Sequence, residues 1–147
     1  MPWFRTENER IADELEKAHD ELRRIVRQLE AHAEVAPYSQ VADRLRQVAD
    51  AERQSVRAIG DRMIALGRQP STAAQGELRA GRNSWERLIF DVEDYRALLR
   101  SLSQLWVRWD DEHPPDAAIV RRALDVATES RDRLNDLAAR ADPHALD

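Results

Sequence analysis

The chain of 147 residues contains no cysteine, four glycines and six prolines, and it lacks any long run of apolar residues. Without cysteine it can form no disulfide, no thiolate zinc site and no cysteine nucleophile. No stretch approaches the ~18 consecutive apolar residues of a membrane-spanning helix, and residues 1–7 lack the apolar centre of a signal peptide. We therefore expect a cytoplasmic protein that does not enter a membrane.

Aromatic residues are also scarce, at 5% of the chain, whereas charged residues make up 35%. Few aromatics, few glycines and few prolines favour helices over a sheet. The 23 basic and 28 acidic residues give a net charge of −5, which argues against nucleic acid as a partner. The length is that of one ordinary domain.

Apolar residues recur three and four positions apart over four segments, which predicts four amphipathic helices. Thr6 and Glu9 form a capping box before the first segment, and Pro37, Gly67 and Pro143 fall where segments end. The expected helices cover about 7–35, 39–66, 77–109 and 116–141. Long helices with short connections predict an all-α, antiparallel, up-down-up-down four-helix bundle that forms one domain over residues 1–147.

One position on the apolar stripes is charged. Glu52 faces the core near the middle of the second helix, and Tyr95 and Ser130 occupy the same level of the third and fourth helices. A buried carboxylate needs a partner, because its transfer from water is costly. We expect these side chains to meet in one polar layer, where the carboxylate either sets the register of the helices or serves as a metal ligand.

A metal site in a helical bundle core usually takes a Glu from two helices and a Glu-x-x-His from each of the other two. Ser55 stands three residues after Glu52, where histidine is expected, and in the fourth helix the residue three positions after Glu129 is Asp132, so the histidine is missing there too. The one Glu-x-x-His is Glu16 and His19 in the first helix. Glu16, His19, Glu52 and Glu129 are therefore the candidate ligands, for iron or manganese.

Catalytic and phosphate-binding motifs are missing from the sequence. It has no G-x-S-x-G, no serine with an evident base and no glycine-rich phosphate loop. His32, His113 and His144 are spread over a helix end, a turn and a tail, and are typical of solvated side chains. We expect a protein without enzymatic activity.

The segment 59–72, with the sequence IGDRMIALGRQPST, resembles the end of the second helix in ferritin-like proteins, above all the mini-ferritins. The resemblance implies a ferritin-like bundle, and helix order and length extend it over nearly the whole chain. It also places the mini-ferritin ligand positions on Arg57 and Asp61, where arginine cannot bind iron. If the chain is compared with classical ferritins instead, the resemblance implies that Glu52 occupies the position of the metal ligand in the second helix. Ser55 then stands where the partner histidine is expected.

Aromatic residues outside the expected core suggest contacts between copies. Trp3 and Phe4 precede the first helix, and Phe90 lies off the apolar stripe of the third, so the three can form a patch for a second subunit. Trp85, Trp106 and Trp109 fit the stripe as core residues, or can enclose an apolar ligand.

The main functional hypothesis is a non-enzymatic ferritin-like bundle that acts through protein–protein assembly as a homo-oligomer, such as a stress-related or cargo module. No cofactor is expected in that case. The alternative hypothesis is a divergent ferritin-like protein that binds or oxidises iron. The two differ in whether Glu52 holds a metal or only sets the helix register.

Overall fold

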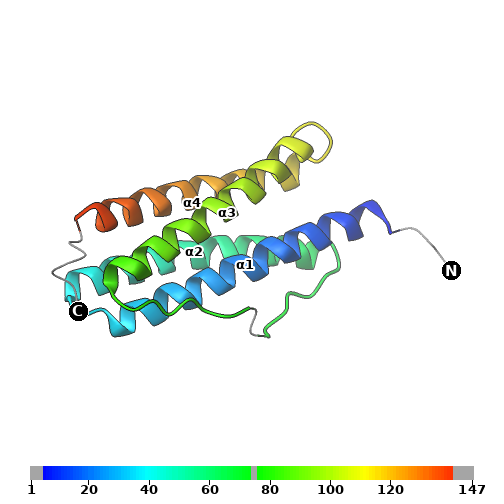
Figure 1. Ribbon diagram of the computed structural model, residues 1–147. Coiled ribbons are helices and arrows are strands. Elements are labelled where there is room, and N and C mark those ends of the chain that lie inside the picture. The colour runs from blue at the N-terminus through cyan, green and yellow to red at the C-terminus, as the bar shows by residue number, and fades with distance from the viewer. Residues whose placement is uncertain (1–4, 74–75, 141–147) are drawn as a thin grey trace.

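A computed structural model describes residues 5–73 and 76–140 of the chain (Figure 1). The described residues form the helices α1 (Glu7–Val35), α2 (Ser39–Ala65), α3 (Ser84–Trp109) and α4 (Pro114–Arg140). These bounds agree with the predicted helices except at the start of the third, which begins at Ser84 rather than at residue 77. None of the four helices is long and apolar enough to cross a membrane.

Local chemistry explains where the helices begin. The Thr6 side chain accepts a hydrogen bond from the backbone N–H of Glu9 at 3.1 Å, as the capping box predicts. The start of α3 is set by Asn83, whose side chain accepts from the N–H of Glu86 at 2.9 Å. Gly81, with φ of 71°, precedes this cap in a conformation that no helix continues. Leu78, which fits the apolar period, therefore belongs to the connection.

The helices form two antiparallel hairpins, α1–α2 and α3–α4, which pack with α1 against α3 and α2 against α4. Arg62 near the end of α2 bonds Asp116 at the start of α4 at 2.7 Å, so these helices run in opposite directions. The buried side chains between the hairpins include Leu22, Ile59, Leu102 and Leu134. The predicted all-α bundle with antiparallel neighbours is confirmed.

The connection between α2 and α3 differs from the expected up-down-up-down order. These two helices lie diagonally opposite and run in the same direction, so the connecting segment, described over residues 66–73 and 76–83, returns along the bundle (Figure 1). We call this segment the crossover. The apolar stripes could not predict it, because each helix buries the same face in either order, and because Leu78 extended the apparent length of the third helix.

Side chains of α1 hold the backbone of the crossover. Arg23 donates to the carbonyl of Ser71 at 2.7 Å, and the N–H of Arg79 donates to the Gln28 side chain at 2.8 Å. The Nε2 of His32 lies 2.5 Å from the carbonyl oxygen of Arg79. These bonds satisfy backbone groups that have no helical partner.

The same side chains of α1 also reach α3 in the interior. Gln28 donates to Asp91 at 2.8 Å and to Asp94 at 2.7 Å, and His32 Nδ1 lies 2.8 Å from Asp91 Oδ2. Asp91 and His32 are 1% and 2% exposed. We call Gln28, His32 and Asp91, together with the Arg79 backbone, the crossover clasp.

The clasp holds a proton between His32 and Asp91. Burial by itself lowers the pKa of His32, but the hydrogen bond and charge of Asp91 and the carbonyl of Arg79 outweigh it, so the pKa lies above 6.5. Burial raises the pKa of Asp91 against the opposing effect of His32 and Gln28. Because the pKa values of His32 and Asp91 are both raised, the pair keeps its shared proton at a pH at which a free histidine has already lost its own.

This shared proton makes stability depend on pH. The unfolded chain releases the His32 proton near 6.5, whereas the folded clasp keeps it, so the clasp stabilises fully below about pH 6.5 and its contribution is lost as the pH rises through the folded pKa. We expect Asp91→Asn to lower the free energy of unfolding at pH 6 by about 3 kcal/mol, the usual cost of breaking a buried pair.

Urea unfolding of wild type and Asp91→Asn at pH 6 and pH 9 measures both effects, and the two proteins should differ less at pH 9. Glu93→Gln is the control, because Glu93 bonds Arg79 from a side chain that is 49% exposed. An Asp91→Asn protein as stable as wild type at pH 6 would contradict the role of the clasp.

Candidate functional site

The predicted polar layer is present in the middle of the bundle. Glu52 of α2 is fully buried, and its Oε2 accepts a hydrogen bond from the Tyr95 hydroxyl of α3 at 2.6 Å. Ser130 of α4 is 3% exposed, and its hydroxyl interacts with both Glu52 and Tyr95. The layer therefore joins three helices, and the Glu52–Tyr95 bond crosses the core between the diagonally opposite α2 and α3.

Burial dominates the electrostatics of this layer. It raises the pKa of Glu52 from 4.5 to about 7, against the opposing hydrogen bonds of Tyr95 and Ser130. Burial and the neighbouring Glu52 raise the pKa of Tyr95 well above 10, so Tyr95 remains a donor. The Oε1 of Glu52 is buried without a hydrogen-bond partner in the described structure. A protonated, neutral carboxyl is therefore a major form of Glu52 at neutral pH.

The side chains at this level do not make up the ligand set of a two-metal centre. Such a centre needs inward-facing Glu-x-x-His pairs on two helices. The inward pair of α2 is Glu52 and Ser55, and that of α4 is Ala127 and Ser130, all four buried. Leu22 fills the interior side of α1. Among the described residues, no three His, Asp, Glu or Cys side chains gather as metal ligands.

The four candidate ligands named from the sequence are not brought together. Glu52 lies in the core, but Glu129 is 67% exposed on the outside of α4 and bonds Arg133 at 2.7 Å. Glu16 bonds the guanidinium of Arg68 in the crossover. Only Glu52 thus has the interior position that a ligand of a core centre needs.

His19 and its sequence partner Glu16 have different contacts. It is 5% exposed, and its ring packs against Gly60 of α2, where a Cβ would lie 3.4 Å from Nε2. Burial and the charge of Arg23 lower its pKa below 6.5. The Nδ1 has no hydrogen-bond partner in the described structure. Glu16 and His19 thus belong to a surface groove and a helix contact, respectively.

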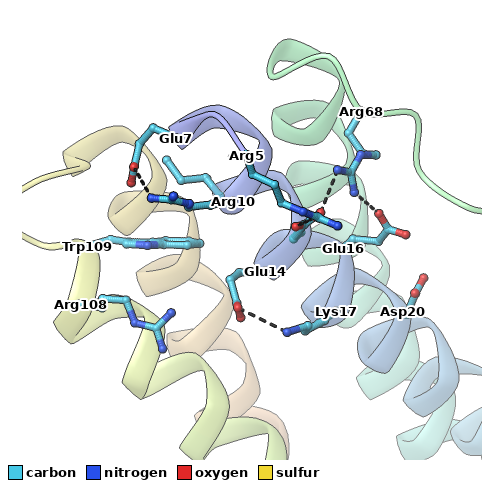
Figure 2. A pocket seen from close by; sticks show the side chains of 12 residues that line it. Arg5, Glu7, Arg10, Glu14, Glu16, Lys17, Asp20, Arg68, Arg108 and Trp109 are labelled. Atoms are coloured by element: carbon cyan, nitrogen blue, oxygen red, sulfur yellow. Dashed lines mark hydrogen bonds and ion pairs between the residues drawn. The ribbon is translucent and has the colours of Figure 1, made fainter. Parts of the chain in front are cut away.

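The groove beside Glu16 has a volume of about 700 Å³ (Figure 2). It lies between the first half of α1, the end of α3 and the start of the crossover. Its charged side chains neutralise one another: Arg68 bonds Asp13 and Glu16, and Lys17 bonds Glu14. A network already occupied in this way leaves little charge for a metal or a charged ligand.

Two surface predictions can be compared with the structure. Phe90 is half-buried, and the guanidinium of Arg79 lies 3.9 Å from its ring centre, so it is not an open apolar patch. Trp3 and Phe4 lie outside the described residues. Trp109 is 4% exposed, and Arg121 covers the ring of Trp106 at 4.7 Å, so both tryptophans already have protein contacts.

The sequence pointed to Glu52, Tyr95 and Ser130 but missed the crossover clasp. The expectation that His32 is a solvated side chain is wrong, because it is 2% exposed. Gln28 and Asp91 fall beside the apolar stripes and resemble solvated residues. The signal that could have found them is the pair of polar positions Gln28 and His32, spaced four apart on one face of a helix.

Comparison of the structure with solved proteins places the bundle in a known class: the fold is the ferritin-like four-helix fold. A dodecameric thioferritin, the bacterioferritin-related protein of Bacteroides fragilis, matches with a TM-score of 0.82 at 19% identity, over 90% of this chain and 86% of that one. A bacterioferritin of Mycobacterium tuberculosis matches with a TM-score of 0.81 at 18% identity, over 88% and 84%. No family model and no curated protein sequence matches.

The buried carboxyl of Glu52 makes stability fall as the pH rises. Between about pH 4.5 and 7 the unfolded chain releases this proton while the folded chain retains it, so the free energy of unfolding decreases by on the order of 3 kcal/mol over that interval. We expect Glu52→Gln, which cannot ionise, to lose this decrease.

Urea unfolding at pH 4.5, 6 and 7.5 measures the dependence. The matched control is Glu129→Gln, which removes an exposed carboxylate and should follow the wild-type curve. A Glu52→Gln protein with the full wild-type decrease would show that Glu52 ionises as an ordinary carboxylate.

Proposed function

We propose that this protein is the subunit of a homo-oligomeric ferritin-like assembly and acts by assembling rather than by oxidising iron in its own core. The observation that carries the proposal is the composition of the central layer. Where a two-metal centre needs two Glu-x-x-His pairs, the inward positions are Glu52, Ser55, Ala127 and Ser130. A single carboxyl bonded to a tyrosine suits helix register better than metal binding.

The comparisons support the assembly part of the proposal. The thioferritin of Bacteroides fragilis is described as dodecameric, and this chain covers most of its length with the same fold. Closed symmetric homo-oligomers are the usual form of soluble assemblies. A stress-related or cargo role and a cytoplasmic location stay predictions from the sequence.

The assembly has a direct test. We expect light scattering after size exclusion to give a mass that is a whole multiple of 17.0 kDa, the mass of one chain, at ~100 μM protein. The measurement is repeated after chelator treatment, and an unchanged mass would separate assembly from metal binding. A 17.0 kDa species as the sole form at this concentration would refute the proposal.

Iron binding is the second candidate function, and two observations favour it. Both structural neighbours are described as ferritins, and the buried Oε1 of Glu52 has no partner in the described structure. This oxygen atom is the position in the layer at which a single metal ion would bind. The remaining ligands would then have to come from Ser55, Tyr95 and Ser130, whose neutral oxygens bind iron or manganese more weakly than carboxylate and imidazole.

Elemental analysis of untagged protein followed by ferrous titration in air distinguishes the two candidates. We expect less than one metal ion per ten chains and no oxidation above the rate in buffer. Glu52→Leu and the control Glu129→Gln are measured in parallel. Stoichiometric iron or manganese that is lost in Glu52→Leu and retained in Glu129→Gln would transfer the assignment to the iron-binding alternative.

A further inference from the structure

The outer face of the α3–α4 hairpin carries a groove whose charge differs from the rest of the molecule. The groove has a volume of about 580 Å³ and lies beside the middle of α3, with one side chain from α4. Its described lining residues are Arg96, Leu99, Arg100, Ser103, Gln104 and Arg131. We call it the arginine groove. Three of these six side chains are guanidinium groups and none is a carboxylate, although the chain as a whole has a net charge of −5.

Two of the three arginines of this groove have no carboxylate partner among the described residues. Arg53, Arg62 and Arg68 each bond a carboxylate. Arg96 and Arg100 are exposed, and no hydrogen bond or ion pair links either to the described residues. Arg131 bonds Asp132, its neighbour in sequence, which does not line the groove.

This arrangement costs stability unless something compensates it. Arg96 and Arg100 are four residues apart on α3, so their charges are neighbours on one helix face and repel each other. Arg131 adds a third guanidinium from α4, whose charge Asp132 balances in the described structure. An anion in the groove would remove this repulsion, so its binding should stabilise the folded protein as well as fill the groove.

The polar lining also specifies the kind of anion. Ser103 can donate a hydrogen bond through its hydroxyl and Gln104 through its amide, so every polar side chain in the groove is a donor. A guanidinium binds two oxygens of one group in a planar fork, and phosphate oxygens match that geometry. The two free forks of Arg96 and Arg100, with two further donors and the guanidinium of Arg131 once it exchanges Asp132 for the ligand, suit an anion that has several ionised oxygens on linked groups.

We propose that the arginine groove binds a small anion with linked phosphoryl groups, either an inorganic oligophosphate or an organic molecule that carries one. Arg96, Arg100 and Arg131 bind the phosphoryl oxygens, and Leu99 forms the apolar floor. The site does not depend on the assembly proposed above, because its residues all belong to one chain. The groove contains three cationic side chains in a protein with a net charge of −5. Nucleic acid requires a larger basic surface than this.

Calorimetric titration of the full chain with tripolyphosphate at ~150 mM salt tests the proposal, since screening over ~8 Å removes long-range attraction at that concentration. We expect saturable binding to one site per chain and a rise in melting temperature. The double variant Arg96→Gln/Arg100→Gln should weaken binding at least tenfold.

The matched control is Arg44→Gln/Arg57→Gln, which removes the same charge from exposed positions of α2 outside the groove. It should bind within twofold of wild type. Arg96→Lys, which keeps the charge and loses the fork, should fall between wild type and the double glutamine variant.

Two further ligands refine the result. Citrate carries three carboxylates and no phosphoryl group, and we expect it to bind at least tenfold more weakly than tripolyphosphate. ATP separates the two sources of the phosphoryl chain: an affinity near that of tripolyphosphate supports an inorganic ligand, and a much higher one supports an organic phosphate.

Three outcomes would overturn the proposal: no saturable binding of tripolyphosphate to wild type, equal loss of affinity in both double variants, or citrate binding as tight as that of tripolyphosphate. Equal loss would mean that the chain attracts anions only through its total charge. Circular dichroism and melting temperature without ligand verify that each variant is folded, so a loss of binding is attributable to the groove.

Discussion

The parallel course of α2 and α3 is the constraint on which the rest of the structure depends. Two diagonal helices that run the same way cannot be joined by a tight turn, so the chain must travel back along the bundle in the crossover. An irregular segment on a helical surface has backbone donors and acceptors without partners. Arg23, Gln28 and His32 of α1 provide those partners, and Gln28 and His32 also bond Asp91, which connects the crossover to α3.

The central layer performs a different task with similar chemistry. Glu52 and Tyr95 connect two helices that lie diagonally opposite in the bundle. A sliding of α2 along α3 by one turn would remove Tyr95 from Glu52 and leave a carboxylate in an apolar environment, which is costly. The layer thus disfavours arrangements in which the helices are shifted along one another, even though their apolar faces would pack similarly well. This role of a buried polar group requires no metal.

Sequence analysis predicted the helices, their bounds apart from the start of α3, and the central layer, because each depends on local information. Apolar spacing, the Thr6 cap and the position of Glu52 within its stripe can be read within a few turns of one helix. The spatial order of the helices could not be obtained in this way, because the stripes of α2 and α3 are buried equally well in either order. The crossover clasp was missed for the same reason: the role of Asp91 is visible only once α1 and the crossover lie beside it.

The candidate metal ligands show where spacing along the chain misleads. Glu16 and His19 have the correct separation for a shared helix face, yet the crossover supplies Arg68 to the first and α2 supplies Gly60 to the second. Glu129 was chosen by analogy with the position of Glu52, but α4 turns it outward. Ligand spacing is informative only when the packing of the helix is known.

The hairpin arrangement also has a consequence for the way the chain folds. Within α1–α2 and within α3–α4 the contacting residues are close in sequence, and contacts of this kind form quickly. The crossover is long enough for each hairpin to form before the two dock. The contacts that remain until docking are those of Glu52 with Tyr95 and of His32 with Asp91, which carry the buried ionisable groups. Desolvation of these groups would then fall in the last step, so the rate of docking, more than that of hairpin formation, should respond to acidity.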